Sequence, residues 1–435
     1  MVDAPIRIEN RAQLIYLLTE AAELEHGISC CYMFAAFGIK SDVNEGVTEE
    51  QLAIIRRWRG TIIQIAIQEM VNLSLACNLL TAVGGAPHLH RPNMPSSLKA
   101  YPPSFRLELA PFCRETLESF VFVERPQDEN DGTSGGPLGS AFLPQNKLSD
   151  IFSSERQYQT VGHLYKGIED GLRYLSQKLG EEQLFLGPPQ AQIADAYFSL
   201  PGLFPVTGLE SDIAAIEGIV EQGEGARGDT KDSHHGRFVA MLEEYDQLLK
   251  DDPQFEPGRP VLRNPYAIIP TDIVDREEAN LIEDPLSADV CNLFDGCYEL
   301  MMQIMGRLLL HTEESEEQLI QLSDITVAMM MDVISPLGVA LTTLPAGPSH
   351  KGLTAGPSFR ASREMHALPH QAAAWSYFAE RLRERSAYCG FLQTPAALSP
   401  VLIKVRQSLA QYARQLSDGV TPPPGVTPSG GRRCL

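Results

Sequence analysis

Basic residues are scarce in this sequence, and long apolar runs are absent from it. It has 35 basic against 56 acidic residues, which gives a net charge of −21 and a pI near 4.9. Because this charge repels phosphate groups, we expect neither nucleic acid nor an anionic membrane as a partner. No run of 18 residues is both uncharged and apolar throughout, so we expect no transmembrane helix.

Disulfide and targeting patterns are missing as well. The eight cysteines include one adjacent pair, Cys30–Cys31, and no CxxC motif. Cysteines within apolar helical runs, such as Cys77, are usually small buried hydrophobic residues. The first residues, MVDAPIRIENRAQ, lack a basic segment followed by an apolar one, so we expect no secretory signal. The expected location is a reducing, cytoplasmic compartment.

No segment shows a clear strand pattern and no repeat of fixed period is present, so the expected fold class is mostly α. Apolar residues recur at helical spacing from residue 11 to 39 and from 48 to 82. Thr48 and Gln51 form a capping box at the start of the second helix. Two long helices joined by a short connection pack antiparallel by default. Further helices are predicted at 160–178, 212–221, 238–250, 292–312, 316–334, 376–386 and 400–416.

The predicted helices divide into two parts and a tail. Residues 1–270 are expected to form a helical bundle with the candidate site, and residues 271–418 a C-terminal helical part packed on the same bundle. Residues 126–147 form a long polar loop, which is typical of a functional or disordered segment. Residues 419–435 are rich in proline and glycine, cannot build a core and are expected to be disordered.

Chemistry is indicated most clearly by Glu69, the one acidic residue of the apolar stretch 62–80. A carboxylate in such surroundings is costly to desolvate unless a cation or hydrogen-bond donors meet it. Asn72 lies three residues further on, so it shares a helix face with Glu69. Glu-x-x-His on a bundle helix is the building block of carboxylate-bridged di-iron sites. Here asparagine stands in the place of that histidine.

Two other helices carry a candidate ligand each. Glu25 lies beside Ala21 and Ile28 on the apolar face of the first helix, and the alternative is a surface charge at the edge of that face. His163 lies in the third helix, where the common alternative is a core histidine without a metal.

A fourth segment combines acids, glycines and histidines. Glu221 and Glu224 precede a glycine-rich stretch, and His234–His235 opens the apolar helix that follows. A charged surface loop would explain the acids but explains the histidine pair less well. Four helical segments that each offer a carboxylate or an imidazole suit iron, manganese or zinc.

Five segments, in order along the chain, resemble one known family: LEHGISCCYMFAAFGIK, IQEMVNLSLACNLLTAVGGAPHL, TVGHLYKGIEDGL, IVEQGEG with SHHGRF, and MDVISPLGVALTTLPAG with TAGPSF. They are similar to the ferritin-like domain of the iminophenyl-pyruvate dimer synthase type, over about residues 10–360. That domain is found in bacterial enzymes that couple two tryptophan-derived imines on the way to violacein and to indolocarbazoles such as rebeccamycin. The resemblance implies a ferritin-like helical bundle with long loops and additional C-terminal helices.

The resemblance also implies a pattern of ligands. The family's Glu-His in the first helix is matched by Glu25 and His26. Its Glu-x-x-His in the second helix is matched by Glu69, with Asn72 in place of the histidine.

On the third helix His163 stands where the family has an acid, and the fourth segment matches with Glu221, Glu224 and His234. One imidazole is thus lost on the second helix and one gained on the third. Three outcomes stay open: a rearranged dinuclear site, a single metal held by a subset of these residues, or an abandoned site. We favour a metal that is retained but rearranged, since buried acids need a partner.

The function implied by the resemblance is a metal-dependent oxidative step in bacterial secondary metabolism. Its substrate would be an amino-acid-derived imine or amine, and oxidative coupling is one form of the reaction. The cofactor expected is non-haem iron, mono- or dinuclear, or another divalent metal. The partner expected is a small-molecule substrate, and a homodimer is left open. Glu25, Glu69 and His163 are the expected catalytic residues, and the expected metal ligands are Glu25, Glu69, His163, Glu221, Glu224 and His234.

Two alternatives belong to other classes of protein. One is a metal-free protein that binds or positions a biosynthetic intermediate. The other, less favoured, is a haem-associated oxidase with His26, His88 or His90 as the axial ligand. Iron without a Soret band, a Soret band, and the absence of any metal distinguish the three.

Overall fold

The computed structural model describes residues 7–96, 106–126, 160–198, 202–225, 231–268, 280–361, 368–392 and 398–419. The predicted long loop beyond Pro126 and the predicted disordered tail beyond Gly419 lie outside these ranges.

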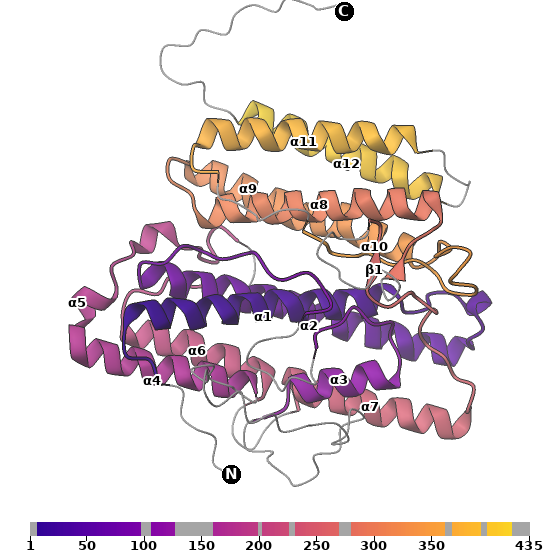
Figure 1. The fold of residues 1–435 in the computed structure, drawn as a ribbon, viewed down its shortest axis with the longest axis horizontal. Coiled ribbons are helices and arrows are strands. Elements are labelled where there is room, and N and C mark those ends of the chain that lie inside the picture. The colour runs from indigo at the N-terminus through magenta and orange to yellow at the C-terminus, as the bar shows by residue number, and fades with distance from the viewer. Residues whose placement is uncertain are drawn as a thin grey trace, which may run out of the picture.

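Two long antiparallel helices, α1 (Arg11–Phe37) and α2 (Glu49–Ala82), form the centre of the fold (Figure 1). The Asn10 side chain caps α1, and Thr48 and Gln51 form the predicted capping box of α2. The short 3-10 helix η1 (Val43–Glu45) lies in the connection between them. Every residue from Leu24 to Phe37 is buried, because α1 is covered by other helices on several sides.

Two interrupted helices complete the bundle. The first consists of α3 (Arg114–Val123) and α4 (Val161–Leu179), and the second of α6 (Leu209–Gly223) and α7 (His234–Asp251). Figure 1 shows them as a layer against α1 and α2, in which α4 packs on α6 and α3 packs on α7. The short helices α5 (Glu181–Leu184) and η3 (Pro189–Ala191) lie between α4 and α6.

The C-terminal helices form a further layer on the opposite side of α1 (Figure 1). They are α8 (Pro285–Leu309), α9 (Glu316–Met329), α10 (Ser335–Leu341), α11 (Gln371–Phe391) and α12 (Ser399–Asp418). One turn of π-helix, η4 (Met330–Ile334), joins α9 to α10. Helix α10 packs on α1, and one hydrophobic core runs through both parts of the chain.

Strands are minimal in the described part of the chain: β1 (Pro265–Tyr266) and β2 (Asn280–Leu281) pair in parallel. The prediction of a mostly α fold is therefore confirmed. Several helices are longer than predicted, because the apolar period continues beyond the polar residues that flank it. The predicted helix 376–386, for example, extends over all of α11.

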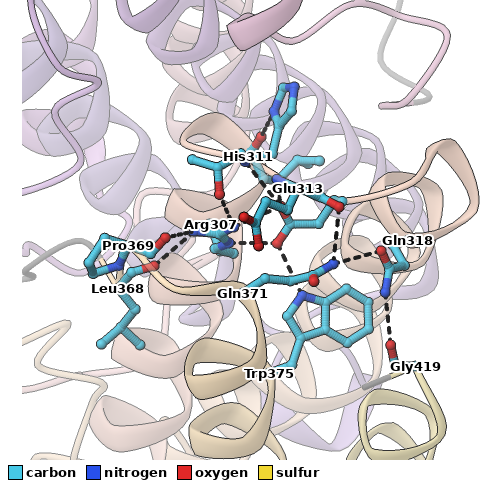
Figure 2. A network of polar contacts seen from close by, with 12 residues as sticks. Arg307, His311, Glu313, Gln318, Leu368, Pro369, Gln371, Trp375 and Gly419 are labelled. Atoms are coloured by element: carbon cyan, nitrogen blue, oxygen red, sulfur yellow. Dashed lines mark hydrogen bonds and ion pairs between the residues drawn. The ribbon is translucent and has the colours of Figure 1, made fainter. Parts of the chain in front are cut away.

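A buried ion pair fixes α11 to the turn between α8 and α9 (Figure 2). Arg307 Nε lies 2.6 Å from Glu314 Oε1, and both side chains are almost fully shielded from solvent. The Arg307 guanidinium also donates to the carbonyl groups of Leu368 and Pro369, and Trp375 Nε1 donates to Glu314. Since all the charge is satisfied by hydrogen bonds, the pair tolerates burial.

Two helical segments are long and apolar enough, by length and composition, to cross a membrane. In Glu49–Ala82, 78% of the apolar window is buried within the protein, and in Glu316–Leu341 the share is 50%. Packing inside the bundle accounts for the apolar character of α2. The expectation of no transmembrane helix stays a prediction.

Candidate metal centre

Three side chains from three helical elements meet in the interior of the bundle. Glu69 projects from α2, Glu124 follows the last turn of α3, and His234 is the first residue of α7. His234 Nδ1 lies 2.8 Å from Glu69 Oε1 and 3.7 Å from Glu124 Oε2. The three potential ligand atoms all lie within 4.8 Å of one another, and all three residues are buried. A carboxylate–carboxylate–imidazole set of this kind suits iron, manganese or zinc.

A fourth side chain, Glu25 of α1, joins this group through Glu69. The carboxyl groups of Glu25 and Glu69 hydrogen-bond to each other, and the Tyr165 hydroxyl donates to Glu25 Oε1 at 2.7 Å. Burial raises the pKa of Glu25 well above its ordinary value, and the charge of Glu69 raises it further. Burial and the charge of Glu69 thus both favour the protonated form of Glu25, which can donate a hydrogen bond to Glu69.

The electrostatics of the group are dominated by burial and by mutual charge. Burial lowers the pKa of His234, but the carboxylates of Glu69 and Glu124 outweigh it and raise that pKa to about 9. Burial raises the pKa of Glu69, but His234 and the other hydrogen-bond donors bring it below its ordinary value. Burial and the charge of Glu69 leave the pKa of Glu124 raised. The same carboxylate charges that raise the pKa of His234 would also stabilise a cation bound between them.

The donor atoms pass a test of fit to a metal. His234 Nδ1 is buried and forms no aligned hydrogen bond, although it lies 2.8 Å from Glu69. The other ring nitrogen, Nε2, lies 3.2 Å from Gln68 Oε1. A histidine that binds a metal commonly donates its second N–H to such an acceptor, which turns the first nitrogen to the ion. Asn72 Oδ1 is a further buried oxygen without a hydrogen bond, while Asn72 Nδ2 donates to Glu69 Oε2 at 2.9 Å.

Polar neighbours hold each carboxylate in place. The Tyr32 hydroxyl donates to Glu124 Oε1, as the Tyr165 hydroxyl does to Glu25. Both tyrosines are almost fully buried, so their hydroxyl groups depend on these contacts. The orientation of the ligand set is consequently built into the fold.

The structure brings together Glu25, Glu69 and His234 from the predicted set, and it adds Glu124. Glu124 was missed because it directly follows a ten-residue helix, α3, in a region for which we predicted no helix. The signal that could have identified it is an acid directly after the apolar residues Phe120 and Val123, which are spaced by three.

Three further predicted ligands lie outside the group of close ligand atoms that the described residues form. His163 is buried in the first turn of α4. Glu224 is also buried, and its Oε1 accepts a 2.9 Å hydrogen bond from the backbone N–H of Gly162. Glu221 is exposed on the last turn of α6. Among the described residues, the group of close ligand atoms contains none of these three.

Two of the three histidines of the haem alternative, His26 and His88, form other contacts. His26 Nδ1 lies 2.9 Å from the Leu89 carbonyl oxygen, and its Nε2 lies 2.7 Å from the Tyr298 hydroxyl. Both ring nitrogens are thus occupied, which disfavours His26 as an axial ligand. His88 Nε2 pairs with Glu23 Oε1 at 3.0 Å.

A bundle of long helices with a buried carboxylate and imidazole group at its centre defines the class of this protein. The family model described as "Ferritin-like" matches residues 18–243, which is more than half of the chain. The chain therefore belongs to the ferritin-like family, and the resemblance predicted from the sequence is confirmed.

Two curated proteins are similar to most of the chain. It is 28% identical over 373 residues to the 2-imino-3-(indol-3-yl)propanoate dimerase of Chromobacterium violaceum, covering 81% of this chain and 34% of that protein. It is 26% identical over 417 residues to the dichlorochromopyrrolate synthase of Lentzea aerocolonigenes, covering 86% and 38% respectively. The chain thus spans little more than a third of the length of these relatives.

A solved structure supports the fold alone. The crystal structure of a ferritin-like protein from Caulobacter vibrioides superposes with a TM-score of 0.51 at 16% sequence identity. The match covers 81% of this chain and 99% of that one.

Proposed function

We propose that this chain is a metal-dependent enzyme of bacterial secondary metabolism that carries out an oxidative step on an amino-acid-derived imine or amine. Both curated relatives are named as enzymes, a dimerase and a synthase, and the first is named for an indolic imino acid. The first name favours a coupling of two substrate molecules, and we propose that this coupling is the oxidative step. The observation that carries the proposal is the buried group of Glu69, Glu124 and His234, with Glu25 hydrogen-bonded to it.

The residues of the group would hold non-haem iron, or another divalent metal with the same preference for oxygen and nitrogen ligands. When bound, such a metal supplies redox or Lewis-acid chemistry to the substrate. Binding replaces protons, so the proton that Glu25 shares with Glu69 and the proton on His234 Nδ1 would be released. Tyr165 and Tyr32 keep Glu25 and Glu124 oriented in both states.

A retained metal also explains why three acids remain buried together. Each ionised carboxylate costs several kcal/mol to desolvate when it is unpaired. The group contains one imidazole, that of His234, and three carboxyl groups. Those of Glu25 and Glu124 both lie close to Glu69. A divalent cation balances that set better than a single imidazolium does.

One observation favours the metal-free alternative. The pKa of His234 is raised to about 9, so its imidazolium and the protonated Glu25 together neutralise much of the group. A protein of this kind would position a biosynthetic intermediate without redox chemistry.

Metal analysis separates the two functions. The protein is loaded with ferrous iron without oxygen, desalted, and analysed for metal and for its absorption spectrum. We expect bound iron without a Soret band, and loss of that iron in Glu69→Gln and His234→Gln. A protein that retains neither iron, manganese nor zinc would support the metal-free alternative, and a Soret band the haem alternative.

The reaction is tested with an imine produced in place. Tryptophan and an amino-acid oxidase supply the indolic imine, and mass spectrometry follows its consumption by the iron-loaded protein in air, where dioxygen is the proposed oxidant of the coupling. We expect a product with the mass of a coupled dimer.

The seven cysteines of the described residues are all free, which agrees with our proposal of a reducing cytoplasm.

A further inference from the structure

A cavity of about 300 Å³ lies between α1, α3 and the segment at residues 106–110. Its size is at the lower end of the range for small-molecule pockets. Most of its wall is apolar, with contributions from Ile28, Leu107, Ala110, Phe120 and Val123.

One side chain, Tyr32, links this cavity to the candidate metal centre. Tyr32 is among the residues that line the cavity, and its hydroxyl donates to Glu124 Oε1. Its ring packs edge-on against Phe120, with 4.6 Å between the ring centroids. A planar molecule in the cavity would therefore contact the aromatic residue that also holds a carboxylate of the centre.

Two arginines line the cavity, and they differ in whether they form an ion pair. Arg263 is paired with Glu108, with Nη1 2.5 Å from Oε2. Arg106 is exposed, and within the described ranges it has no hydrogen-bond or ion-pair partner. Its guanidinium is thus available for an anion, and the planar fork of an arginine matches a carboxylate.

We propose that this cavity is the substrate pocket and that its ligand is an aromatic carboxylate. The ring of the ligand lies against Tyr32 and Phe120, and its carboxylate meets Arg106. This inference rests on the proposed function, which it deepens by assigning the pocket and a residue that determines specificity. Tyr32 is the side chain through which occupation of the pocket reaches Glu124.

Two probes with the same ring separate the two parts of the pocket. Indole-3-propionate carries the ring and a carboxylate, whereas 3-methylindole carries the ring alone. Their affinities are measured by calorimetry on the metal-free full chain, so that the result does not depend on metal binding. We expect both to bind, with the acid tighter.

The variants test each contact by itself. Arg106→Gln should lower the affinity for indole-3-propionate by about tenfold, the effect of losing one charge-assisted contact. The affinity for 3-methylindole should not change. Arg173→Gln, an exposed arginine on α4 that pairs with Glu169, is the matched control and should change neither affinity. Ala110→Leu fills part of the cavity and should lower the affinity for both probes. Circular dichroism checks that this variant is folded.

The outcomes are distinct from those of the proposed function. Equal affinity of wild type and Arg106→Gln for the acid would overturn the role of Arg106. Undiminished binding of both probes to a folded Ala110→Leu would overturn the assignment of the pocket. If both probes bind as expected in a protein that takes up no metal, the pocket stands and the proposed metal-dependent reaction fails.

Discussion

The Glu224 carboxylate caps the start of α4: its Oε1 accepts a 2.9 Å hydrogen bond from the backbone N–H of Gly162. A Cβ atom at position 162 would lie 2.1 Å from that same oxygen. Glycine is therefore required by the close approach of the carboxylate and not by its backbone angles. A carboxylate at a helix N-terminus is stabilised both by the free N–H groups and by the helix dipole.

We predict that Gly162→Ala destabilises the fold by displacing Glu224. The loss should be about 1.5–3 kcal/mol, the contribution of a hydrogen bond to a charged group. Urea denaturation of Gly162→Ala, Glu224→Ala and the double variant measures it. Because Glu224→Ala removes the clash together with the bond, adding Gly162→Ala to it should cost little. Additive losses would show that the contact does not limit position 162.

Metal uptake should depend on Glu124 and not on Glu221. Glu124 lies within the group of close ligand atoms, while Glu221 is exposed on α6. We predict that Glu124→Gln lowers iron affinity by at least about tenfold, and that Glu221→Gln leaves it unchanged. Competition with a chelator of known affinity measures both. Equal losses in the two variants would show that the metal lies nearer to the end of α6.

The sequence was sufficient to predict the buried residues of the candidate metal centre wherever burial made a charge unusual. Glu69 is the single acid of the apolar stretch 62–80, and such a residue requires a partner whatever the fold. Glu25 shares the face of Ala21 and Ile28, so its burial follows from helical periodicity. His234 opens an apolar helix, which placed it correctly at a helix N-terminus.

The rest of the site depends on tertiary structure. Which residue at the end of α6 faces the bundle depends on where the helix ends, at Gly223. The periodicity of the sequence does not predict the end of a helix to within one turn. This is why Glu221 and Glu224 could not be distinguished. The position of Glu124 beside His234 depends on the packing of α3 against α7, two helices that are far apart in sequence.

The buried ion pair of Arg307 and Glu314 should be strongly asymmetric in its response to mutation. Arg307→Met leaves Glu314 without its cation in a site that solvent barely reaches, so we predict a loss of about 3–5 kcal/mol in the free energy of unfolding. Arg307→Met combined with Glu314→Leu should recover part of that loss, since no charge remains buried. Chemical denaturation of both variants measures the difference. A double variant no more stable than Arg307→Met would contradict the role assigned to the charge.

Asp295 of α8 should make stability depend on pH. Burial raises the pKa of this carboxyl to about 7, against the hydrogen bonds from Ser358 Oγ and the Arg360 N–H, which favour the ionised form. Between about pH 4, the pKa of an unfolded aspartate, and pH 7, the folded protein holds a proton that the unfolded chain has lost. The contribution of Asp295 to the free energy of unfolding is therefore full below about pH 4, falls as pH rises to 7, and is constant above.

The Asp295→Asn variant removes this titration, so the pH dependence is read from its difference from wild type. As pH rises from 5 to 7.5, the free energy of unfolding of wild type should fall relative to that of Asp295→Asn. The upper limit is on the order of 3 kcal/mol, at about 1.4 kcal/mol per pKa unit, and solvent access to this partly buried group reduces it. Asp289→Asn, an exposed aspartate on the same helix, is the control. Only a group that changes its protonation on unfolding makes the free energy of unfolding depend on pH. If the difference in this free energy between wild type and Asp295→Asn does not change with pH, Asp295 is ionised in the folded protein throughout this range.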